Sequence, residues 1–116
     1  MSDYAKGKVV LVPFPFTDLS ASKVRPAVIV SDNLAGDDVV VAFISSQKPA
    51  TLQKTDILLD EGKQKFFRQT GLKTTSVIKI GKLATLEKKI IIGELGTVDS
   101  MIQKETDRSL KILFGI

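Results

Sequence analysis

The chain has 116 residues, 43% of them apolar, which is enough for one hydrophobic core and predicts a single domain over residues 1–116. It contains no cysteine and no histidine, which excludes disulfides, thiolate metal sites, the commonest zinc ligand and the usual acid–base catalyst. Its formal net charge of +4 is modest, so the distribution of charge along the chain is more informative than the total.

The first 16 residues carry an early acidic residue and only a short apolar run, which Pro13 and Pro15 interrupt. Such a run is too short for the core of a signal peptide or for a membrane span. We therefore expect a cytoplasmic protein with no membrane partner.

Short apolar runs rich in valine and isoleucine, separated by proline, glycine, aspartate and serine, predict a series of strands. A polar loop over residues 17–23 follows the first strand, and a turn around residues 33–36 joins the second and third strands as a hairpin. Such a series of short strands is typical of a small β-barrel. The predicted strands are residues 8–14, 26–31, 39–44, 56–59, 76–80, 82–86 and 90–94.

The last segment changes to a helical period. Asp99 is a suitable N-cap, because its carboxylate can accept hydrogen bonds from the free N–H groups of the first turn. Gly115 can end the helix where a left-handed residue is needed. The predicted fold class is therefore mainly β, a barrel with a C-terminal α-helix. Four side chains are spaced to face the barrel: Ile102, Thr106, Leu110 and Leu113.

Positive charge is concentrated in the middle of the chain. Residues 63–89 contain eight basic residues and one acidic residue, a net charge of +7, and the segments on either side are slightly negative. Phe66 and Phe67 lie between basic residues there, an arrangement that suits a polyanion whose bases stack on exposed rings. A solvated loop with buried phenylalanines explains the same pattern equally well.

The carboxylates at residues 37–38 and 60–61 adjoin in the sequence, and such pairs on turns more often solvate a loop than bind magnesium. We therefore expect no metal site and no cofactor. RNA can be cut without a metal, because its own 2′-hydroxyl is the nucleophile and the protein has only to move protons and stabilise the charged phosphorane. The guanidinium of arginine suits the second task, since it binds phosphate oxygens bidentately and keeps its charge.

Arg25 is one candidate for this role, since it follows the polar loop and precedes Pro26 and an apolar run, which places it at the rim of the barrel. Ser45 and Ser46, at the end of the third predicted strand, are others, because a hydroxyl beside an arginine can hydrogen-bond a phosphate. A solvated arginine at a strand start is the commoner case, and serines at a strand end commonly cap or turn. Spacing alone does not decide between these interpretations.

The segment GKVVLVPFPFTDLSASKVRPAVIVS resembles the opening of the MazF/PemK (Kid-like) toxins of type II toxin–antitoxin systems, in which a strand and a loop lead to an arginine–proline pair. VVVAFISSQ is similar to the third strand of that family, TSVIKIGKLATLEKKIIIGELG to its later strands, and DRSLKILFGI to its terminal helix. The resemblance spans nearly the whole chain, in the order of the family. It implies a small SH3-like barrel of the CcdB/PemK type with a C-terminal helix, and a two-fold homodimer.

The resemblance also implies a function: metal-independent, sequence-specific cleavage of single-stranded RNA that leaves 2′,3′-cyclic phosphate and 5′-hydroxyl ends, as an mRNA interferase does. On this basis Arg25 corresponds to the catalytic arginine of the family and Ser45 to its catalytic threonine or serine. The residues expected to contact RNA are Thr17, Asp18, Lys23, Ser46, Lys79 and Lys82.

The chain departs from the family pattern at Gly81 and Ala84, where many relatives carry an acidic residue and an arginine. Lys79 and Lys82 are the groups that could hold phosphate instead. Besides RNA, the expected partners are a second copy of the chain and a cognate antitoxin whose acidic, disordered tail occupies the same groove. The alternatives are a barrel that binds nucleic acid or protein without cutting it, and a gyrase poison resembling CcdB.

Overall fold

The computed structural model describes residues 4–13, 24–32 and 36–116. Within these ranges two short 3₁₀ helices, η1 Phe67–Thr70 and η2 Lys88–Ile90, precede and follow the longest strand in the sequence. An α-helix, α1 Ser100–Phe114, follows the last strand. The architecture is mainly β with a C-terminal helix, as the sequence predicted. The strands are β1 Lys8–Pro13, β2 Val24–Ile29, β3 Asp38–Ser45, β4 Asp56–Leu59, β5 Ser76–Glu87 and β6 Gly93–Thr97.

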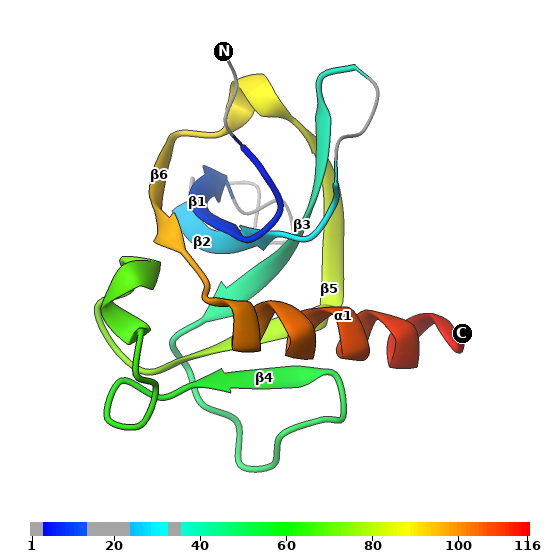
Figure 1. Cartoon of the computed structure of the whole chain (residues 1–116). Helices are drawn as coiled ribbons and strands as arrows, with labels where there is room; N and C mark the ends of the chain where they lie inside the picture. Colours follow the sequence, from blue (N-terminus) through cyan, green and yellow to red (C-terminus); the bar gives the residue numbers. More distant parts are fainter. Residues whose placement is uncertain (1–3, 14–23, 33–35) are drawn as a thin grey trace.

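These strands form one sheet in the order β4-β5-β3-β2-β1-β6, in which every neighbouring pair is antiparallel. The sheet curls into a half-barrel, and α1 packs on β4 and β5 (Figure 1). Lys8 of β1 lies opposite Thr97 of β6, so this pairing joins the two strands that are farthest apart in the sequence.

Alternation along β3 divides the buried side chains between the two sides of the sheet. Val39, Val41 and Phe43 enter one apolar cluster, to which β1 and β2 also contribute. Ala42 and Ile44 enter the other cluster, which includes a buried isoleucine of α1. We call the second cluster the helix-side core.

β5 is one continuous strand of 12 residues, whereas the sequence predicted two strands separated at Gly81. Ala42 of β3 lies opposite Leu83, but the next residue, Phe43, lies opposite Lys79. The intervening residues of β5, Gly81 among them, therefore have no partner on β3. The predicted boundary marks a bulge, where the hydrogen-bond ladder shifts its register without ending.

The prediction of a strand over residues 90–94 is wrong in position, because β6 is Gly93–Thr97. Ile91 is buried, but Ile92 is 58% exposed, and η2 occupies the start of this apolar run. A turn between β5 and β6 therefore takes residues whose composition is typical of a strand. The first four predicted strands agree with β1 to β4 to within two residues at each end, and Phe14, the loop at 17–23 and residues 33–35 lie outside the described residues.

The predicted caps of α1 are confirmed. The Asp99 side chain accepts a hydrogen bond from the backbone N–H of Ile102 (2.9 Å), and Gly115 adopts a left-handed conformation with φ 67°. The predicted contact of Leu113 is wrong: its side chain is 37% exposed, and Ser109 is buried instead. The last turn of the helix projects past the sheet, so a residue on the correct face finds nothing to cover it (Figure 1).

Two glycines allow η1 and β6 to pack backbone against backbone. Gly71, directly after η1, has a φ of 75°, and a Cβ there would overlap the carbonyl oxygen of Leu95. A Cβ on Gly96 would overlap the carbonyl oxygen of Gln69. Because no side chain fits between these backbones, the segment around η1 is held directly against β6.

Replacing Gly96 by alanine is expected to lower the free energy of unfolding by about 2–3 kcal/mol, because the new methyl group must displace backbone atoms. Gly93→Ala in the same strand is the matched control, since a Cβ at Gly93 meets nothing within 4 Å. Urea denaturation of both variants at one protein concentration measures the difference. Equal unfolding midpoints would contradict the close approach of η1 and β6.

Candidate nucleic-acid interface

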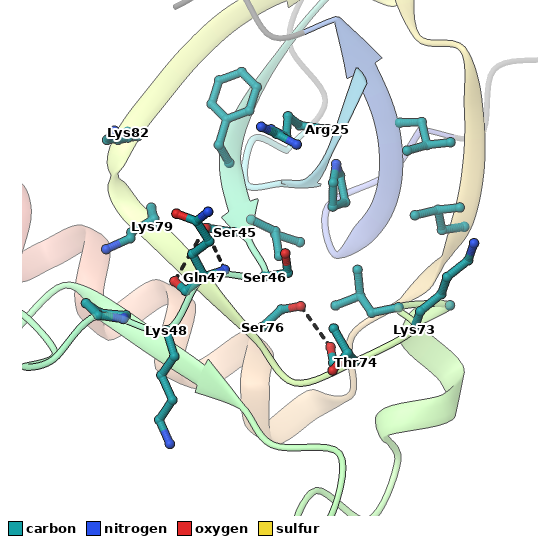
Figure 2. Close-up of a pocket in the computed structure, with 18 residues that line it drawn as sticks. Arg25, Ser45, Ser46, Gln47, Lys48, Lys73, Thr74, Ser76, Lys79 and Lys82 are labelled. Atoms are coloured by element: carbon teal, nitrogen blue, oxygen red, sulfur yellow. Dashed lines mark hydrogen bonds between the residues drawn. The ribbon is translucent and has the colours of Figure 1, made fainter. Parts of the chain in front are cut away.

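An open pocket of about 850 Å³ lies on the sheet, with α1 behind it in the view of Figure 2. Its lining comes from β1, β2, β3, β5 and β6, and from the connecting segments 46–49 and 71–74. The curl of the sheet therefore brings strands from both ends of the chain to one opening.

The pocket combines positive charge with apolar side chains. No acidic residue lines it within residues 4–13, 24–32 and 36–116. Cationic groups beside an apolar surface suit a ligand that carries both phosphates and flat bases. The basic lining residues are Arg25, Lys48, Lys73, Lys79 and Lys82. The apolar ones are Leu11, Pro26, Phe43, Ile44, Pro49, Leu72 and Leu95.

Arg25 is the second residue of β2 and lies opposite Val12 of β1. Its side chain is exposed and lines the pocket (Figure 2). The guanidinium therefore lies where an anion that enters the pocket would meet it. Arg25 lies at the start of a strand, as the sequence predicts.

The hydroxyl group of Ser45 is oriented by the turn that follows β3. Its Oγ accepts a hydrogen bond from the backbone N–H of Gln47 (3.1 Å), and the hydroxyl makes a longer contact with the carbonyl oxygen of the same residue (3.5 Å). Ser46 is exposed and also lines the pocket. The end of β3 thus presents two hydroxyl groups to the pocket, one of them held by the backbone.

Lys79 lies opposite Asp56 in the β4–β5 pair. Its Nζ is 3.5 Å from Oδ2 of Asp56, and the same oxygen accepts the backbone N–H of Gln53 (2.8 Å). The Asp56 side chain is only 4% exposed, compared with 24% for Lys79. From the sequence Asp56 is only the start of a strand, because no local pattern specifies which residue of β5 it faces.

Three other lysines line the pocket without an ion-pair partner in the part of the chain that the structure describes: Lys48, Lys73 and Lys82. Lys82 belongs to the bulge of β5 and was predicted to contact RNA. The sequence did not single out Lys48 or Lys73, although Lys73 belongs to the basic stretch at 63–89. Figure 2 shows Lys79 and Lys82 on one side of the pocket and Lys73 on the other.

Hydrogen bonds fix the wall of the pocket between η1 and β5. The Ser76 hydroxyl donates to the carbonyl oxygen of Thr74 (2.8 Å), and Thr75 Oγ1 accepts the backbone N–H of Glu61 (3.0 Å). Gly71, at the start of this wall, packs on β6 as described above. The position of Lys73 is therefore set by ordered neighbours on both sides in the sequence.

The basic stretch contributes to the pocket only in part. Three of its eight basic residues line the pocket, and neither Phe66 nor Phe67 does. Phe67 is buried in the helix-side core. Phe66 is 41% exposed, and the Nζ of Lys65 lies 5.4 Å from the centre of its ring. Phe66 thus fits the interpretation of this segment as having exposed rings, and Phe67 fits the one that expects buried phenylalanines.

Thr17, Asp18 and Lys23 lie outside the described residues. Gly81 and Ala84, the two departures from the family pattern, do not line the pocket; Ala84 packs against the apolar cluster that contains Phe43.

Among the residues described, no helix is long and apolar enough to cross a membrane. The described residues also contain no cluster of three or more acidic, histidine or cysteine side chains that could hold a metal ion. The described side chains that line the pocket are basic, hydroxyl-bearing, amide-bearing or apolar.

Comparison with solved structures shows the same fold in toxins and endoribonucleases. A Mycobacterial endoribonuclease in complex with its cognate antitoxin is 18% identical, with a TM-score of 0.74 over 97% of this chain and 95% of that chain. A second Mycobacterial endoribonuclease is 20% identical, with a TM-score of 0.74 over 100% and 95% of the two chains. MazF from Deinococcus radiodurans is 17% identical, with a TM-score of 0.72 over 97% and 96%.

Comparison with curated protein sequences gives no match. The family model for the PemK-like, MazF-like toxin of type II toxin-antitoxin system matches residues 5–114. Because this match covers nearly all of the 116 residues, the chain belongs to the PemK-like, MazF-like family of toxins.

Proposed function

We propose that the chain is a metal-independent endoribonuclease that cuts single-stranded RNA at specific sequences, and that it acts as the toxin of a toxin–antitoxin pair. The observation that carries the proposal is the presence of Arg25, Ser45 and four lysines in one pocket of a chain from this toxin family. The similarity in fold to two structures described as endoribonucleases supports it.

In the proposed reaction the 2′-oxygen of RNA attacks the adjacent phosphorus, so that the P–O2′ bond forms and the P–O5′ bond breaks. Arg25 stabilises the negative charge of the phosphorane through its N–H donors. Ser45 donates its O–H hydrogen to a phosphate oxygen, since its Oγ is held by the N–H of Gln47. Protons move from the 2′-hydroxyl and to the 5′-oxygen through water in the open pocket. The products carry 2′,3′-cyclic phosphate and 5′-hydroxyl ends.

RNA on either side of the cut is bound by charge and by apolar contact. Lys79 and Lys82 hold phosphate, Ser46 adds a hydrogen bond, and the apolar lining of the pocket receives bases. Thr17, Asp18 and Lys23 are assigned to RNA binding on the family resemblance alone. The base sequence that is recognised does not follow from these residues.

Incubation with a long single-stranded RNA in the presence of EDTA is expected to give discrete cuts. Arg25→Ala is expected to slow cutting more than a hundredfold, or by about 3 kcal/mol in the barrier, because one charge-stabilising donor is lost. Ser45→Ala is expected to slow cutting less, because water can replace one hydroxyl. Single-turnover rates on a defined oligonucleotide measure both effects.

Arg108→Ala is the matched control, because Arg108 is exposed on α1 and does not line the pocket. Near-normal cutting by Arg25→Ala would contradict the assignment of Arg25 as a catalytic residue. Intact RNA with a shifted band would favour the binding module, and inhibition of supercoiling by gyrase would favour the gyrase poison.

A homodimer is part of the same proposal. Three apolar side chains at the end of α1 are exposed: Ile112 (48%), Leu113 (37%) and Phe114 (61%). A second copy that covers them would remove apolar surface from water, and a two-fold assembly would carry two basic pockets. This arrangement explains why the last turn of the helix is apolar although it projects past the sheet.

Sedimentation equilibrium at micromolar concentration is expected to give the mass of two chains. Phe114→Asp is expected to weaken self-association at least about tenfold, because it places a charge in the buried apolar contact. A mass of one chain for the parent, together with preserved RNA cutting, would contradict the dimer.

We also propose that an antitoxin with an acidic tail, disordered when free, controls the enzyme by occupying the pocket. The absence of described acidic residues from the pocket lining favours a ligand rich in carboxylates as well as RNA. One of the similar structures is a complex of an endoribonuclease with its cognate antitoxin, which supports a partner of this kind.

The double variant Lys73→Glu/Lys82→Glu is expected to weaken neutralisation by the antitoxin at least about tenfold, since two attractive charges become repulsive. Titration of the antitoxin into an RNA-binding assay at several salt concentrations measures the effect, and affinity for both ligands is expected to fall as salt rises. Undiminished inhibition of the double variant, with affinities that do not depend on salt, would contradict a shared site.

A further inference from the structure

Asp56, Lys79 and Phe43 occupy opposed positions on the neighbouring strands β4, β5 and β3. Directly opposed residues point to the same side of a sheet, so these three side chains form one row. Lys79 and Phe43 line the pocket, whereas Asp56 on the edge strand does not. The carboxylate therefore lies beyond the ammonium group, as seen from the pocket.

The carboxylate of Asp56 is fixed by the turn that precedes β4. Its Oδ2 accepts the backbone N–H of Gln53 (2.8 Å), and the backbone N–H of Asp56 donates to the carbonyl oxygen of Gln53 (3.0 Å). In the same turn the carbonyl oxygen of Thr55 accepts the N–H of Ile80, in the bulge of β5 (3.2 Å). Turn, bulge and carboxylate form one connected unit, and the low exposure of Asp56 leaves little room for water to move it.

Such a pairing changes what Lys79 offers to a ligand. The ammonium group keeps N–H donors for the pocket, but the adjacent negative charge cancels most of its field at longer distances. Lys82 and Lys73 have no ion-pair partner among the described residues, so their full charge acts on an approaching polyanion. Among the described residues the pocket thus has two kinds of lysine: some without an ion-pair partner, and Lys79, whose charge Asp56 neutralises.

We propose that Asp56 is a positioning residue for RNA: its buried carboxylate holds the Lys79 ammonium at the pocket and neutralises it, so that Lys79 binds a phosphate oxygen as a directed hydrogen-bond donor. The inference rests on the proposed function and deepens it. It assigns the long-range attraction of RNA to the unpaired lysines, and the alignment of the phosphate beside Ser45 to the Asp56–Lys79 pair.

The variant Asp56→Asn tests the proposal, because the amide oxygen of asparagine can still accept the N–H of Gln53 while the negative charge is lost. Binding of a single-stranded 2′-O-methyl RNA, which cannot be cut, is expected to tighten about threefold at low salt, because Lys79 becomes a free cation. The slope of log K against log salt is expected to steepen by about 0.7, the value for neutralising one more phosphate charge on a single strand. Cutting of unmodified RNA is expected to slow about tenfold in kcat, because the donor is no longer held in place.

Glu94→Gln is the matched control. Glu94 pairs with Lys8 (3.0 Å) and does not line the pocket, so this variant also removes one paired acid but frees a lysine elsewhere. At an ionic strength of about 0.1 M it is expected to leave binding, slope and kcat within about 1.5-fold of the parent, because neither Glu94 nor Lys8 lines the pocket and salt weakens the effect of exposed charges outside it.

The double variant Asp56→Asn/Lys79→Gln removes both charges and therefore leaves no partly buried charge unpaired. It is expected to restore the salt slope of the parent and to keep the low kcat. Thermal unfolding of all variants separates these effects from loss of structure.

An unchanged slope and kcat in Asp56→Asn, or weaker binding in parallel with a lower unfolding temperature, would overturn the positioning role. A parent that binds the 2′-O-methyl RNA but cuts no RNA would remove the nuclease proposal and leave Asp56 to be judged by the salt slope. A parent that binds no RNA would overturn both proposals.

Discussion

The register shift between β3 and β5 decides which side chains of β5 reach the pocket. Ile78 and Ile80 belong to the helix-side core, and Lys79 between them lines the pocket, as regular alternation requires. Continued alternation would direct Lys82 into the core under α1 and Leu83 to the pocket. The bulge reverses this assignment, so that Leu83 packs against the core and Lys82 lines the pocket. Because of this one bulge, the same strand supplies apolar side chains to the core and basic side chains to the pocket.

The same irregularity explains where sequence-based prediction succeeds and where it fails. Apolar runs locate the strands, and Asp99 and Gly115 mark the ends of α1, because capping depends on neighbours a few residues away. The sequence around Gly81 predicts two strands where the structure has one, since a bulge and a turn have similar local composition. The sequence predicts a core contact for Leu113 that the structure lacks, because periodicity gives the face of a helix but not the extent of the surface beneath it.

Prediction of the candidate site from the sequence also succeeds for local features and fails for those that depend on tertiary packing. The family resemblance and the pattern of loop and strand directed attention to Arg25 and Ser45, and both line the pocket. Lys48 and Lys73 were missed, since their place in the pocket depends on how connecting segments pack. Asp56 is not identified from the sequence for a related reason. Its proposed role depends on its position opposite Lys79, and strand register is a property of the folded sheet. Sequence therefore identifies the chemical groups more readily than the pairs they form.

The pairing of β1 with β6 has a consequence for how the molecule assembles. Lys8 and Thr97 are opposed in that pair, so the contact must close a loop that includes most of the chain. Sheets that depend on such distant contacts fold slowly, on a timescale of about milliseconds to seconds. Leu11 of β1 and Leu95 of β6 reach the pocket from the two strands that this closure joins, so a partly folded chain has no complete site. The proposed site would then form only with the longest-range pairing of the sheet, and RNA and a pocket-binding partner would both depend on that same closure.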